Sequence, residues 1–160
     1  MSRKKNPVEK RGKGLIYHIY NRGNRKAEIC LDIKDYVFLY NLLCFHFRQN
    51  MFDILYLCIM PNHYHVVVKN NGRNSRGDVM RKIASRYTKY YNSKYRETGH
   101  LFQGQYKHKV ITSSRNLRLL TRYIENHFME SKSFKREPYF FKNDFATKYF
   151  ELNLEDDNED

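Results

Sequence analysis

The sequence predicts an α+β domain of the ferredoxin-like, split βαβ type: an antiparallel sheet with helices on one face, followed by an extra C-terminal helix. Strand-like runs of apolar or alternating residues take turns with longer segments in which apolar residues recur every three to four positions. Two strand-like runs are separated only by Pro61 and Asn62, which predicts a tight hairpin. The resulting order is strand, helix, strand, strand, helix, strand, helix, which excludes an all-β barrel.

The first half of the chain supplies three strands and one helix. Residues 15–21 alternate apolar and polar side chains, as a strand does. Residues 32–49 predict a helix, because Asp32 can cap its N-terminus and apolar residues recur at helical spacing. Residues 52–60 form a nearly continuous apolar run typical of a central strand. Residues 63–69 then predict the return strand of the hairpin.

The second half adds two helices and one strand. Residues 78–94 predict a helix with a tyrosine-rich apolar side and a basic side. Residues 101–111 predict a strand that Gly104 can bulge or break. A third helix begins at Ser113 or Ser114. Residues 131–150 are aromatic without a period, and we expect part of this segment to pack back on the domain.

Charge divides the chain into three parts: a basic flexible arm at residues 1–13, one folded domain at 14–150 and an acidic tail at 151–160. The tail holds six acids and no base, so the other 150 residues carry 30 Lys and Arg against 11 Asp and Glu. The whole chain is 41% apolar and 16% aromatic, enough for a real core. A small basic domain rich in aromatic residues predicts a polyanionic partner, most often nucleic acid.

Several protein classes are excluded. The longest apolar run, residues 54–60, is far shorter than the ~20 residues of a membrane span. No apolar segment follows the basic N-terminus, as a signal peptide would require. Cys30, Cys44 and Cys58 are few, odd in number and lack a CxxC motif, which argues against a disulfide scaffold or zinc ribbon. We expect buried free thiols and a cytoplasmic protein.

Four side chains point to chemistry. His63 and His65 alternate along a predicted strand, so they share a face and can form half of a divalent-metal site. Tyr123 and His127 are four residues apart on the last helix and are neighbours on its surface. Spacing alone leaves open that these are surface histidines and a partly buried tyrosine. Other tyrosines are rival nucleophiles: Tyr87, Tyr90, Tyr91, Tyr95 and Tyr106.

The chain resembles the HUH single-tyrosine transposases, and more specifically the REP-associated tyrosine transposases. Four pieces carry the resemblance in the family's order: YHIYNRGN at 17–24, MPNHYHVVV at 60–68, the stretch from 87 to 107 with GHLFQGQYK, and RYIEN at 122–126. Together they span about residues 15–130.

The resemblance implies that Tyr123 is the nucleophile and that His63 and His65 bind a metal, Mg²⁺ or Mn²⁺. The family usually has an amide residue one helical turn after the tyrosine as third ligand, and often a proline after it. Here these positions hold His127 and Phe128, so His127 is the expected third ligand.

Such an enzyme is a metal-dependent single-strand DNA endonuclease and strand transferase. Tyrosine attacks a backbone phosphorus, forms a 5′-phosphotyrosine and frees a 3′-hydroxyl, so rejoining needs no external energy. The expected partner is single-stranded or hairpin DNA, bound by a monomer or homodimer. Basic and polar residues are the expected DNA contacts: Arg22, Asn24, Arg25, Lys26, Arg86, Lys89, Lys107, Lys109 and Arg115.

Four alternatives stay open. The departure at His127 is compatible with a catalytically impaired regulator that binds hairpin DNA on the same fold. A non-catalytic nucleic-acid-binding module on the same frame is another. RNA-recognition motifs share this frame, but their signature run is missing here. Replication initiators and relaxases of the wider HUH group are usually larger. A metal hydrolase that activates water would keep its activity after Tyr123→Phe.

Overall fold

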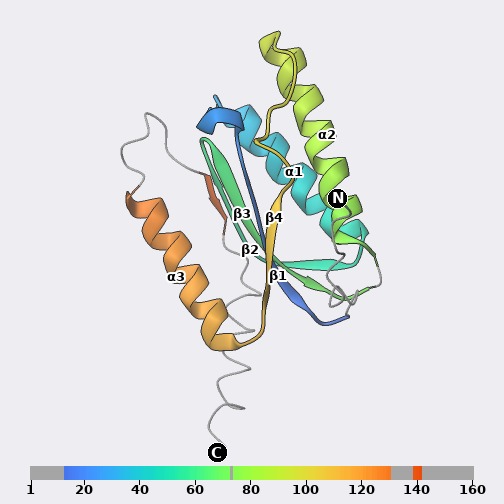
Figure 1. Ribbon diagram of the computed structural model, residues 1–160, viewed down its shortest axis with the longest axis vertical. Coiled ribbons are helices and arrows are strands. Elements are labelled where there is room, and N and C mark those ends of the chain that lie inside the picture. The colour runs from blue at the N-terminus through green and yellow to red at the C-terminus, as the bar shows by residue number, and fades with distance from the viewer. Residues whose placement is uncertain (1–12, 73, 131–138, 142–160) are drawn as a thin grey trace, which may run out of the picture.

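The computed structural model describes residues 13–72, 74–130 and 139–141. They form a sheet between two helical layers (Figure 1). The acidic tail predicted at 151–160 and all but the last residue of the predicted basic arm lie outside the described residues.

Two helices cover one face of the sheet and the third covers the other. Helices α1 (Ile33–Gln49) and α2 (Arg76–Tyr95) pack side by side, and α3 (Ser114–Glu130) lies across the sheet from them (Figure 1). The three predicted helices are confirmed. The predicted split βαβ arrangement with an added C-terminal helix is therefore the fold of the chain.

The sheet has five strands in the order β4-β1-β3-β2-β5, and every neighbouring pair is antiparallel. Its first four strands follow the ferredoxin-like order, and β2 and β3 form the predicted hairpin. The strands are β1 (Ile16–Arg22), β2 (Phe52–Met60), β3 (His63–Asn70), β4 (Lys107–Ile111) and β5 (Tyr139–Phe141).

The strand predicted over 101–111 forms only in its second half, and the chain leaves the sheet around Gly104, where a bulge or break was expected. Only Lys107–Ile111 forms β4, while Phe102 makes a single bridge to Gly23 beyond the end of β1. Residues 103–105 are Gln, Gly and Gln and all three are exposed, so no alternating apolar face holds them on the sheet. The segment instead becomes a loop beside the end of β1, where Gln103 N–H donates to the Arg22 carbonyl at 2.9 Å.

The sequence pattern did not predict β5. It lies within the aperiodic stretch that was expected to pack back on the domain, and it does so by pairing with β2 at the edge of the sheet. Three residues are too few to display a period of two.

The α1–α2 layer encloses the larger core and is held by a buried carboxylate. Asp32 caps α1 as predicted and forms a capping box with Asp35. The Asp35 carboxylate is fully buried and accepts hydrogen bonds from Lys94, Tyr90 and Tyr95. Burial of a charge is tolerated only with such partners, so these side chains tie the end of α2 to the start of α1.

The three cysteines are free and buried, as expected. No helix in the described part of the chain combines the length and the apolar character needed to cross a membrane.

Candidate active site

The face of the sheet under α3 is polar toward the β2–β3 hairpin. Side chains directly opposite each other on paired strands share a face. Arg22 on β1 pairs with His63 on β3, Tyr20 pairs with His65, and Tyr20 also pairs with Lys107 on β4. The register therefore gathers two imidazoles, a phenol and two cations on one side of three strands.

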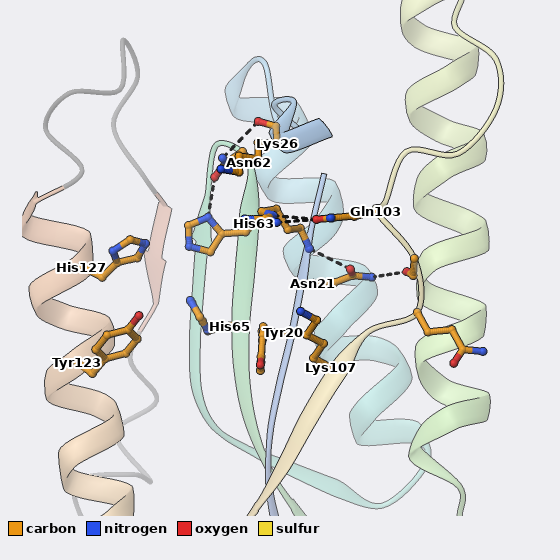
Figure 2. A pocket seen from close by; sticks show the side chains of 13 residues that line it. Tyr20, Asn21, Lys26, Asn62, His63, His65, Gln103, Lys107, Tyr123 and His127 are labelled. Atoms are coloured by element: carbon orange, nitrogen blue, oxygen red, sulfur yellow. Dashed lines mark hydrogen bonds between the residues drawn. The ribbon is translucent and has the colours of Figure 1, made fainter. Parts of the chain in front are cut away.

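The other half of this face is apolar and anchors α3. Leu117 and Ile124 of α3 are buried against Ile16 and Val67 of the sheet. Tyr123 and His127 flank this apolar stripe and project from α3 toward His63 and His65 (Figure 2). The two candidate residues of α3 thus face the two candidate histidines of β3, as expected.

A cleft of about 600 Å³ lies between α3, the sheet and the loop before β4. It brings together the four residues that the sequence analysis singled out for chemistry. It is lined by Tyr20, Asn21, Arg22, Lys26, Asn62, His63, His65, Gln103, Gly104, Gln105, Lys107, Tyr123 and His127.

The aromatic rings in the cleft lie close to one another. The ring centre of His63 lies 5.1 Å from that of His65 and 5.2 Å from that of His127. The rings of Tyr123 and His127 are parallel, with centres 6.1 Å apart. His127 therefore neighbours both the phenol ring of Tyr123 and the imidazole of His63.

Each strand histidine uses its Nδ1 atom in a hydrogen bond with a neighbour. Nδ1 of His63 lies 2.6 Å from Oδ1 of Asn62, the last residue of the hairpin turn. Nδ1 of His65 lies 2.9 Å from Nε2 of His18 on β1. His18 is itself buried, and its ring stacks on those of Tyr20 and His65, which also lie near each other.

Burial keeps these histidines neutral. It lowers the pKa of His63 to about 4, with a further contribution from the nearby His127 and Arg22. Burial lowers the pKa of His65 to about 2, helped by the neighbouring imidazoles, and that of His18 to about 4, helped by Lys109. A neutral imidazole carries the lone pair that binds a metal.

The donor set fits one half of a metal site. Two neutral imidazoles on one strand offer nitrogen ligands of the kind that bind divalent transition metals. Among the described residues, no three His, Cys, Asp or Glu side chains are gathered closely enough to hold an ion. His63 and His65 thus form a pair, and His127 faces that pair from α3.

The structure separates the rival tyrosines. Tyr87 is buried and donates to the Ile29 carbonyl, and Tyr90 and Tyr95 donate to Asp35, all in the opposite layer. Tyr91 likewise donates to the Glu28 carbonyl. Tyr106 lines a neighbouring groove between α2 and the loop before β4. Two tyrosines of the described chain line the cleft, Tyr123 with 60% of its surface exposed and the half-buried Tyr20.

The predicted DNA contacts fall into three groups. Arg22, Lys26 and Lys107 line the cleft, and the Arg22 guanidinium donates twice to Gln103 at 2.7 and 3.0 Å. Asn24 and Lys89 line the neighbouring groove. The remaining four are exposed and line neither cavity: Arg25, Arg86, Lys109 and Arg115.

Several cleft residues were not among the candidates from sequence. Asn21, Asn62 and Gln103 line the cleft, and His18 lies within hydrogen-bond distance of the cleft residue His65. All four lie inside the stretches that carry the family resemblance, which was the available signal. Their types and spacing alone gave no reason to single them out.

Comparison with known families decides the relationship. The model of the family described as transposase IS200-like matches residues 12–127. The chain belongs to this transposase family. No curated protein matches it in sequence.

Solved structures agree with this assignment at the level of the fold. One is a REP-associated tyrosine transposase bound to a REP hairpin, with a TM-score of 0.62 and 18% identity, covering 85% of this chain and 78% of that one. Another is a putative transposase from Deinococcus radiodurans R1, with a TM-score of 0.52 and 18% identity, covering 79% of this chain and 97% of that one. The IS200-like chain described here shares their architecture.

Proposed function

We propose that this transposase cuts and rejoins single-stranded DNA next to a hairpin, using Tyr123 as the nucleophile. The observation that carries the proposal is the position of Tyr123. It is an accessible tyrosine in a cleft that also holds two neutral histidines and three basic side chains. Membership of a transposase family and the likeness to a protein bound to a REP hairpin support this choice of reaction and partner.

The chemistry conserves the number of phosphate ester bonds. The Tyr123 oxygen attacks a backbone phosphorus, the bond to the 3′-oxygen breaks, and the proton lost by the phenol is balanced by one taken up by the new 3′-hydroxyl. The product is a 5′-phosphotyrosine, and a second 3′-hydroxyl can attack it to restore a DNA strand. The phenol of Tyr123 is exposed, so a bound strand can reach it. A strand held in the cleft would make the attack effectively intramolecular.

A divalent cation, Mg²⁺ or Mn²⁺, completes the proposal. His63 and His65 would hold it, with His127 as a third ligand, and it would polarise the scissile phosphate and offset charge on its oxygens. Arg22, Lys26 and Lys107 would neutralise neighbouring phosphates whether or not the ion is bound.

The test is a covalent-adduct assay. The protein is incubated with Mn²⁺ and labelled single-stranded hairpin DNA from its own genomic flanks, and a band that resists SDS is sought. We expect the band with the wild type and with Tyr20→Phe, which removes the other tyrosine hydroxyl in the cleft. We expect none with Tyr123→Phe or His63→Ala. Cleavage without an adduct in Tyr123→Phe would instead identify a hydrolase that activates water.

A catalytically impaired regulator is the second candidate. The observation in its favour is that, among the described residues, His63, His65 and His127 line one cleft but do not form a group of three close enough to hold an ion. It predicts tight hairpin binding without an adduct in the wild type. His127→Gln, which introduces the amide usual in the family, would then give an adduct if His127 is the cause of the impairment.

A further inference from the structure

His63 and His65 each make a hydrogen bond through Nδ1 to a neighbouring side chain. For His63 the partner is the amide of Asn62, and the orientation of this amide is fixed by its other end. Asn62 Nδ2 donates to the Lys26 carbonyl at 3.4 Å, which leaves Oδ1 facing the imidazole (Figure 2). An amide oxygen only accepts, so the proton of neutral His63 lies on Nδ1 and its lone pair on Nε2.

For His65 the partner is a second imidazole, which admits two proton arrangements. In the first, His65 Nδ1–H donates to His18 Nε2, and the His65 lone pair lies on Nε2. In the second, His18 Nε2–H donates to His65 Nδ1, and His65 carries a proton on Nε2. The first arrangement makes His65 a cation ligand, whereas the second makes it a donor to an anion.

We infer that His18 is a positioning residue, which accepts the Nδ1–H of His65 and so keeps the Nε2 lone pair of His65 free for a divalent cation beside that of His63. The fixed lone pair of His63 favours this arrangement. A phosphate oxygen would be repelled by that lone pair, whereas in the first arrangement a cation would be attracted by the lone pairs of both imidazoles, whose ring centres are 5.1 Å apart. The inference rests on the metal site of the proposed function.

The fold explains why His18 can do this. His18 pairs with Val67 and Tyr20 pairs with His65, so His18 and His65 are diagonal neighbours on the same face of two adjacent strands. His18 is 7% exposed and stacks on Tyr20, with ring centres 4.8 Å apart. Because His18 is so enclosed, water cannot readily replace it as the acceptor. In many metal sites, a residue that hydrogen-bonds the other ring nitrogen of a histidine ligand orients that ligand in this way.

The first arm of the test needs no metal. Long-range ¹H–¹⁵N NMR spectra of the metal-free protein at neutral pH report which ring nitrogen of each histidine carries the proton. We expect His63 and His65 both protonated on Nδ1. In His18→Phe we expect His65 to lose this fixed form, and in His18→Gln, whose side-chain carbonyl can accept, to retain it. A proton on Nε2 of His65 in the wild type would overturn the inference.

The second arm measures Mn²⁺ affinity by electron paramagnetic resonance. We expect His18→Phe to weaken binding about 10- to 100-fold, and His18→Gln to recover most of it. His46→Phe is the matched control, because His46 is also buried but lies on α1 on the other side of the sheet. Unchanged affinity in His18→Phe would overturn the inference.

The two arms distinguish the inference from the proposal beneath it. A wild type that binds no Mn²⁺ refutes the metal site, while the NMR arm still decides whether His18 sets the protonation of His65. Thermal unfolding of each variant, compared with His46→Phe, separates loss of the hydrogen bond from loss of the fold.

Discussion

Gly23 closes the turn that shapes one wall of the cleft, and replacing it with alanine is a sharp test of that geometry. Its N–H donates to the Asn62 carbonyl at 2.8 Å, and its carbonyl accepts from Lys26 N–H at 3.0 Å. A Cβ at this position would lie 2.1 Å from the carbonyl oxygen of Ala27 and 3.0 Å from Cγ2 of Ile29. The backbone angles, φ −59° and ψ 145°, suit any residue, so the cost of alanine is steric.

The magnitude follows from that contact. Relieving it requires the backbone of Ala27 to move by roughly 1 Å, because the atom met is part of the main chain and not a flexible side chain. Overpacking of this kind costs about 1–3 kcal/mol. For a chain of this size about 2 kcal/mol lowers the melting temperature by roughly 4–8 °C. Lys26, which lines the cleft, lies inside the displaced turn.

Urea and thermal unfolding of Gly23→Ala provide the assay, with Gly104→Ala as the matched control. Gly104 lines the same cleft, but a Cβ there would meet no atom within 4 Å. We expect the control to stay within about 0.5 kcal/mol of the wild type. If Gly23→Ala were equally stable, the packing of the turn deduced from the structure would be refuted.

Two further predictions concern pH and salt. His18, His63 and His65 stay neutral in the folded state down to about pH 4 or below, whereas an unfolded histidine titrates near pH 6.5. The unfolded chain therefore binds protons first, and the free energy of unfolding should fall below pH 6.5 by up to about 1.4 kcal/mol per pH unit for each histidine. Urea unfolding at a series of pH values between 7.5 and 5 measures this dependence. We expect the free energy of unfolding to depend less steeply on pH in His18→Phe than in the wild type. A wild-type free energy of unfolding that does not change with pH would contradict the burial argument. Lys107→Ala should lower the magnitude of the slope of log K against log salt for single-stranded DNA binding by about 0.7. Lys34→Ala, on α1, is the control and should leave the slope unchanged. An unchanged slope in Lys107→Ala as well would place the DNA elsewhere.

Most helices and strands of the fold could be predicted from local sequence patterns. The period of two put His63 and His65 on one face, and helical spacing put Tyr123 next to His127, because each pattern depends only on the backbone of its own element. The Asp32 cap and the Pro61 turn are likewise local, and they define where α1 begins and where the hairpin folds. The amino-acid sequence by itself therefore determined the three helices, the first three strands and the two pairs of candidate residues.

Tertiary structure decided what those pairs meet. Strand register placed Tyr20 opposite His65, and it brought His18 within hydrogen-bond distance of that imidazole. Packing in the opposite layer removed the tyrosines of α2 from consideration and left Tyr123 in the cleft. Register and packing depend on contacts between residues far apart in the chain, which no local period records.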